Sequence, residues 1–101
     1  MFRVIDTIQL NSTLYGHHPE WQARFGSEGL LAILDPADAS EVLVSPGTVI
    51  RVHRPDGSSA EHTTTATERP STAVGLFFPH LTPDDIPRLS TLEPIPTIEN
   101  V

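Results

Sequence analysis

The chain has 101 residues, of which 38% are hydrophobic, and it carries a formal charge of -7 from 13 acidic and 6 basic residues. This length allows one modest hydrophobic core, because two domains would each be too small to bury enough surface. The acidic surplus disfavours binding to the phosphate backbone of nucleic acids, and the absence of cysteine excludes disulfides, zinc-thiolate sites and thiol nucleophiles.

No targeting or membrane segment is apparent in the hydropathy pattern. The longest uninterrupted apolar run is Leu30–Leu34, far shorter than the ~20 residues of a membrane-spanning helix. The N-terminus lacks a basic segment followed by an apolar stretch and a cleavage site. We therefore expect a cytoplasmic protein.

Short runs of β-forming residues are the main structural signal. Ten prolines and six glycines divide the chain into segments rich in Val, Ile, Leu, Thr and Phe, a spacing typical of all-β barrels and sandwiches. The first run predicts a strand over residues 2–10, with polar residues mostly on its second face and an interruption at Asp6. The apolar residues expected to share its other face are Phe2, Val4, Ile8 and Leu10.

Residues 11–28 form a long excursion without strand periodicity. Within it, Pro19–Phe25 predicts two helical turns, since proline suits the first position of a helix. Loops longer than about 12–15 residues are uncommon in compact domains and are often functional. The excursion is therefore the first place to look for a site.

The remaining strands follow in quick succession. The clearest turn signal is Arg54-Pro55-Asp56-Gly57, which predicts a hairpin. If its loop has three residues, Arg51 lies opposite Glu61 and forms an exposed ion pair worth under about 1 kcal/mol. Further strands are expected over residues 29–35, 41–45, 48–54, 59–67, 72–78 and 90–93, with turns at 68–71 and 79–89. The prediction is one domain over residues 1–94, with six or seven strands, and an extended or loose tail over residues 95–101.

The second half of the chain resembles the second domain of translational GTPases of the elongation factor Tu type. Val74–Phe78 resembles that family's Val-Gly strand, Asp85–Arg88 its acidic connector, and Ser90–Leu92 its last strand. Upstream, Pro46–Val52 resembles another strand start, and Phe2–Leu10 resembles the opening strand. The resemblance implies a small all-β fold, a six- or seven-stranded antiparallel β-barrel that is closed or nearly closed.

Several departures limit what the resemblance implies for function. Leu89 stands where the family's connector has glycine, and the excursion replaces a glycine-rich turn. The family holds the aminoacyl end of tRNA with an aromatic residue and an asparagine, whose matched positions here are Ile8 and Ala73, so that role is not expected. A phosphate-binding loop requires lysine, and this chain has none.

The excursion holds the densest group of aromatic and polar side chains. The residues that we take as a candidate binding surface are Tyr15, His17, His18, Trp21 and Phe25. Trp21 and Phe25 are four residues apart, so both can lie on one side of a short helix, which we expect to cross an open end of the barrel. In this interpretation the two histidines are solvated.

A metal site is the competing interpretation of the same segment. The imidazoles of His17 and His18 and the carboxylate of Glu20 could ligate a transition metal, joined by one of His53, His62 or His80. Adjacent histidines point to opposite sides of an extended chain, however, and need a turn to reach one ion. The interpretation of this segment as an aromatic binding surface predicts no cofactor.

Phe77 and Phe78 raise the question of a covering element. As neighbours in a strand they point to opposite faces, so one belongs to the core and the other must be covered by the excursion or by a partner. Paired carboxylates such as Asp84 and Asp85 lie beside a turn, where such residues usually cap or solvate it, and they do not indicate catalysis.

These observations favour a noncatalytic binding or interaction module with a protein partner. One alternative is a small metal-dependent enzyme that uses His17, His18 and Glu20. Another is an acidic regulatory or immunity-type inhibitor of a basic partner protein, which fits the charge of the chain. The sequence leaves the partner and the oligomeric state open.

Overall fold

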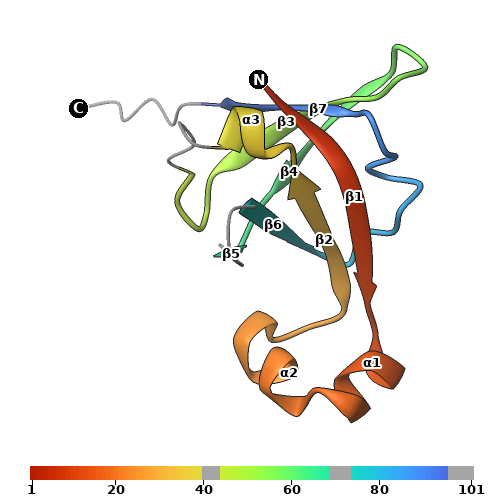
Figure 1. Cartoon of the computed structure of the whole chain (residues 1–101), viewed down its shortest axis with the longest axis vertical. Helices are drawn as coiled ribbons and strands as arrows, with labels where there is room; N and C mark the ends of the chain where they lie inside the picture. Colours follow the sequence, from red (N-terminus) through yellow and green to blue (C-terminus); the bar gives the residue numbers. More distant parts are fainter. Residues whose placement is uncertain (40–43, 69–73, 96–101) are drawn as a thin grey trace.

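The computed structural model describes residues 1–39, 44–68 and 74–95 (Figure 1). Its elements are β1 (Phe2–Leu10), α1 (Ser12–His17), α2 (Pro19–Phe25), β2 (Gly29–Leu34), α3 (Pro36–Ala39), β3 (Val49–His53), β4 (Ser59–Thr63), β5 (Ala66–Glu68), β6 (Val74–Pro79) and β7 (Thr91–Ile95). No helix in the described ranges is long and apolar enough to cross a lipid bilayer.

The strands form one antiparallel sheet of seven, in the order β4-β3-β7-β1-β2-β6-β5. This confirms the predicted all-β fold with six or seven strands, although the single strand predicted over residues 59–67 is two strands, β4 and β5. The sheet is open, however, so the fully closed barrel was wrong: β4 and β5 are its two edge strands. The two edge strands are consecutive in the chain and are joined by only two residues, so the two edges must lie close together. The sheet therefore curls round its core.

Thr64 and Thr65 make the corner between the two edge strands. The Thr64 amide donates to the Thr48 carbonyl at 3.0 Å, and the Thr65 amide donates to the Phe77 carbonyl at 3.1 Å. The buried hydroxyl of Thr64 also donates to the Phe77 carbonyl, at 2.8 Å. The Thr64 amide is thus hydrogen-bonded to the residue before β3, whereas the Thr64 hydroxyl and the Thr65 amide are hydrogen-bonded to β6. These bonds fix the point where the chain passes from one edge of the sheet to the other.

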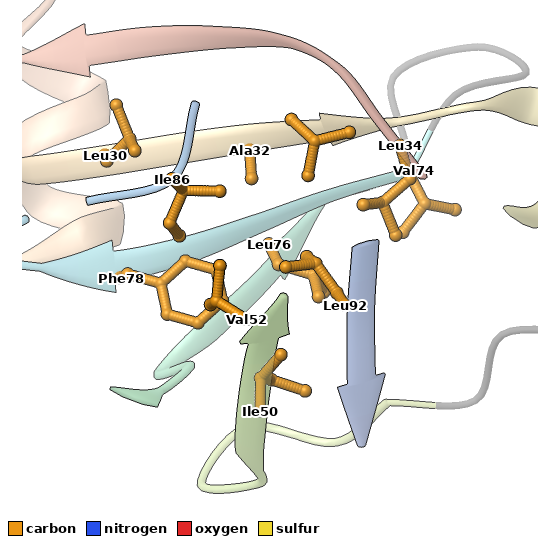
Figure 2. Close-up of a cluster of buried hydrophobic side chains, with 11 residues drawn as sticks. Leu30, Ala32, Leu34, Ile50, Val52, Val74, Leu76, Phe78, Ile86 and Leu92 are labelled. Carbon is orange, nitrogen blue, oxygen red and sulfur yellow. The ribbon is translucent and has the colours of Figure 1, made fainter. Parts of the chain in front are cut away.

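The main core lies on the inner face of the curled sheet (Figure 2). Alternate residues of β2 and β6 point into it and meet side chains from β3 and β7, as the period of two along a strand requires. Its fully buried members include Leu30, Ala32, Leu34, Ile50, Val52, Leu76, Phe78, Ile86 and Leu92. Burying each large apolar side chain stabilises the fold by about 1.5–3 kcal/mol.

A β-bulge in β1 corrects the predicted apolar face. Val4 pairs with Leu34, and Asp6 pairs with Ile33, the neighbour of Leu34 in β2. Two steps along β1 therefore match one step along β2, and Ile5 is an extra residue without a partner. An extra residue reverses the alternation of side chains beyond it. Val4 therefore lies in the inner core, whereas Leu10 belongs to a second cluster on the outer face.

The outer face of β2 and β6 carries that second cluster. Its buried members are Leu10, Tyr15, Leu31 and Phe77. Both strands are therefore buried on both faces, which explains why neither Leu30–Leu34 nor Val74–Phe78 alternates with polar residues. The excursion supplies the cover, since α1 and α2 lie at the ends of β1 and β2 (Figure 1).

The C-terminal strand differs from its prediction. β7 extends to Ile95, which pairs with Val49 of β3, and it includes Pro94, which pairs with Ile50. Val44 and Ser45, predicted as strand, lie outside the strands. The rest of that predicted strand, most of the turn after Glu68, Ala73 and residues 96–101 lie outside the described residues.

The connector from Pro79 to Ser90 is tied to the turn between β3 and β4 and to β1. The Thr82 amide donates to the Asp85 carboxylate at 2.8 Å, so Asp85 caps the turn as expected. The Arg54 guanidinium donates to the Asp85 carbonyl at 2.9 Å, and Arg88 Nε donates to the Ile5 carbonyl at 3.0 Å. Leu89 adopts a φ of 70°, a conformation that favours glycine.

Candidate functional site

The first part of the excursion is anchored by polar contacts. Asn11 caps α1, because its side-chain oxygen accepts from the Leu14 amide at 2.9 Å. The Tyr15 side chain is buried, and its hydroxyl donates to the Ser27 carbonyl at 2.6 Å. Burial, with a smaller contribution from Glu28, raises the pKa of Tyr15. Tyr15 is therefore a structural anchor and not part of an exposed binding surface.

Helix α2 spans Pro19–Phe25, as the sequence predicts. Proline occupies its first turn, and the helix ends at Gly26, whose φ of 83° is accessible to glycine without strain. The Phe25 ring stacks on Phe77, with centroids 4.7 Å apart. This protein's own excursion therefore covers Phe77: α2 lies at the end of β2 (Figure 1), and its Phe25 packs against the outer-face cluster.

An apolar groove lies between α2 and the outer face of the sheet, and its volume is about 630 Å³. The floor comes from β1 and β2, and the wall comes from α2. The lining residues are Ile8, Leu10, Leu31 and Ile33 on the floor, Trp21, Ala23 and Phe25 on the wall, and Glu20, Arg24 and Glu68. Leu10 is fully buried at its base, whereas Ile8 remains 37% exposed.

Charged side chains surround this apolar floor. Arg24 of α2 forms an ion pair with Glu68 of β5, which connects the helix to the edge strand. The Glu68 side chain is only 17% exposed, while that of Glu20 is 65% exposed. Asp6 lies on the same face of β1 as Ile8 and pairs with Ile33 across the ladder. Three carboxylates therefore border the groove, with one guanidinium.

The two histidines of the excursion do not line the groove. The His18 ring stacks on Trp21, with centroids 4.3 Å apart, and its Nδ1 lies 3.4 Å from the Glu20 carboxylate. His17 is the last residue of α1 and is exposed. In the part of the chain that the structure describes, no three histidine, aspartate or glutamate side chains are grouped so that they could hold a metal ion.

The histidines of the sheet and the connector are dispersed. His53 faces outward, and its Nε2 lies 3.0 Å from the Glu93 carboxylate. His62 pairs with the core residue Ile50 and so faces the opposite side of the sheet. The amide of His80, at the end of β6, donates to the Glu28 carbonyl at 2.9 Å.

The outer face of β3, β4 and β7 carries an exposed ionic network. Arg51 pairs with Glu61 in the ladder, and its Nη2 lies 2.7 Å from the Glu61 carboxylate, which confirms the predicted ion pair. The hydrogen bond from His53 lowers the pKa of Glu93. Exposed pairs of this kind contribute little to stability, so this network is scaffold.

The aromatic wall of the groove could be predicted from the sequence, but its floor could not. Trp21 and Phe25 line the groove, whereas Tyr15, His17 and His18 do not. Ile8 was assigned to the core because the bulge at Ile5 has no clear sequence signal. The uninterrupted run from Leu30 to Leu34 was the available clue, since strands buried on both faces read as continuous apolar runs.

No family model matches this chain, and no curated protein or solved structure matches it either. What the groove can do follows from its lining. Among the described lining residues there is no hydroxyl, imidazole or amide side chain, and the charged ones are Glu20, Arg24 and Glu68. The arrangement is suited to burying apolar groups.

Proposed function

We propose that this protein is a noncatalytic interaction module that binds a partner protein in the groove between α2 and the outer face of β1 and β2. The observation that carries this proposal is the partial exposure of an apolar floor beside two aromatic side chains. Ile8 is 37% exposed at the mouth of a groove of about 630 Å³, a size within the range of about 300–1,000 Å³ of binding pockets.

The lining has the composition of a binding hot spot. Trp21 and Phe25 each present part of their ring surface to the groove and rest on the buried second cluster. Large aromatic side chains supported by a packed base contribute most of the energy in many interfaces. Covering the remaining apolar surface would stabilise a complex by about 25 cal/mol per Å², before the entropic cost of association.

The scaffold that we propose is that of the translation-factor second domain. The order of strand β6, connector and strand β7 supports it, as does the conformation of Leu89. This residue stands where that family's connector has glycine, and its φ of 70° is one that glycine adopts freely. The tRNA-binding role is not part of the proposal, because a shared scaffold does not carry a function with it.

Affinity capture with matched variants tests the proposed function. Ile8→Asn places an amide on the groove floor, while Leu89→Asn makes the same kind of change at a side chain that is 62% exposed on the connector. We expect native extract to yield a partner with the unmodified protein and with Leu89→Asn, but not with Ile8→Asn. Capture of nothing, or equal capture by both variants, would refute a role for the groove.

A further inference from the structure

We infer that the partner segment in the groove is a basic amphipathic peptide segment, with apolar side chains that face the floor and lysine or arginine residues that flank them. This inference rests on the proposed function and adds the chemistry of the partner.

The border of the groove is acidic. Asp6 lies beside Ile33 on the floor, and Glu20 lies in the first turn of α2, where its side chain is 65% exposed. The single basic lining residue of the described chain, Arg24, is already paired with Glu68. The carboxylates of Asp6 and Glu20 therefore attract cationic groups, while the local guanidinium charge is largely neutralised.

The charge of the whole chain acts in the same direction. With a formal charge of -7, the protein attracts a basic partner over a longer range and repels an acidic one. A second copy of this chain would carry the same charge and be repelled. The residues after Ile95 include Glu99 and no basic residue, so the chain's own C-terminal segment is also poorly matched in charge.

The placement of polar groups favours a peptide segment over a small polar molecule. Every charged lining residue belongs to the border, and the floor of Ile8, Leu10, Leu31 and Ile33 is entirely aliphatic. Small ligands are normally oriented by a few polar groups within the pocket. An amphipathic helix instead places several apolar side chains in a groove and its charged residues along the edges.

Trp21 provides a direct measurement, because it is the one tryptophan of the chain and lies in the groove wall. The probes are three tryptophan-free peptides of equal length: two amphipathic ones, of leucine with lysine and of leucine with glutamate, and a wholly polar one of serine and lysine. We expect only the leucine–lysine peptide to change Trp21 fluorescence at low concentration, with an affinity at least about tenfold above that of the leucine–glutamate peptide. Added salt should weaken its binding.

Matched variants locate the charge effect. The pair Asp6→Asn with Glu20→Gln removes the carboxylate beside the floor residue Ile33 and that of the lining residue Glu20. The pair Glu61→Gln with Asp84→Asn removes two carboxylates elsewhere on the surface. We expect the first pair to weaken the leucine–lysine peptide by roughly three- to tenfold and the second pair to change its affinity by less than about twofold. Circular dichroism confirms that all variants are folded.

The outcomes separate the two proposals. Equal binding of the leucine–lysine and leucine–glutamate peptides, no binding of any peptide, or equal weakening by both variant pairs would each overturn the inference about charge. The proposed function is judged independently, by whether Ile8→Asn loses a native partner that Leu89→Asn keeps. Loss of that partner together with equal peptide binding would leave the groove as the site and reject only the basic segment.

Discussion

Phe25 of α2 stacks on Phe77 of β6, with ring centroids 4.7 Å apart and an angle of 29° between the rings. Phe77 is fully buried, while Phe25 is partly buried. This contact joins the excursion to the outer face of the sheet, and Phe25 also lines the groove together with Trp21. Stability and the shape of the groove are therefore linked through one aromatic pair.

Phe25→Ala is expected to lower the free energy of unfolding by about 2–3 kcal/mol, because it removes the stacked ring and leaves Phe77 uncovered. Trp21 fluorescence should shift to longer wavelength as α2 loosens. Chemical denaturation followed by far-UV circular dichroism gives the first value. Phe25→Leu, which keeps an apolar cover, should cost less, and a loss below about 0.5 kcal/mol for Phe25→Ala would contradict this role of the stack.

Leu89→Gly is expected to raise the free energy of unfolding by about 1 kcal/mol. Leu89 holds a φ of 70° and is 62% exposed, so glycine relieves backbone strain and forfeits little burial. Leu89→Ala keeps the strain and is the matched control. Thermal or urea denaturation checks the difference, and equal stability of the two variants would show that the connector is unstrained.

Gly29→Ala is expected to destabilise the protein by at least about 3 kcal/mol. A Cβ at Gly29 would overlap the Phe78 carbonyl oxygen and lie 2.7 Å from Cζ of Phe77, so β2 and β6 would have to separate. Gly16→Ala is the control, because a Cβ there meets nothing within 4 Å and alanine favours helix by roughly 0.5–1 kcal/mol. If Gly29→Ala stabilised the protein, as Gly16→Ala is expected to, the close approach of β2 and β6 at Gly29 would be contradicted.

Tyr15 should limit stability at alkaline pH. Burial raises its pKa above the ordinary value of 10.0, so the folded state holds this proton more tightly than the unfolded state does. The resulting stability is complete below pH 10 and is lost as the pH rises through the raised pKa. The chain has one tyrosine, no lysine and no cysteine, so Tyr15 and the arginines are the only side chains that can lose a proton in this alkaline range.

Unfolding measurements from pH 8 to 11.5 check this expectation, with the phenolate absorbance of Tyr15 recorded in parallel. Tyr15→Phe should lower stability at pH 8 by about 1 kcal/mol through loss of the hydrogen bond to Ser27, and its stability should no longer fall above pH 10. A variant that keeps the full alkaline loss would show that Tyr15 is not the group responsible.

Several elements could be predicted from local pattern. The opening strand, the helix from Pro19 to Phe25 and the pairing of Arg51 with Glu61 all follow from spacing, proline placement and turn chemistry within a few residues. Phe77 and Phe78 were expected to face opposite sides because adjacent strand residues always do. These features depend on short-range geometry, and the structure confirms each of them.

The site depended on contacts between distant residues. Nothing near Ile8 in the sequence shows that an extra residue at Ile5 turns its side chain from the core to the outer face. The pairing of Arg24 with Glu68 likewise joins positions 44 residues apart along the chain. The all-β class was determined by the sequence itself, because periodicity and turn residues are local. The open sheet and the groove were decided by the tertiary structure, because register and the packing of α2 are set by long-range burial.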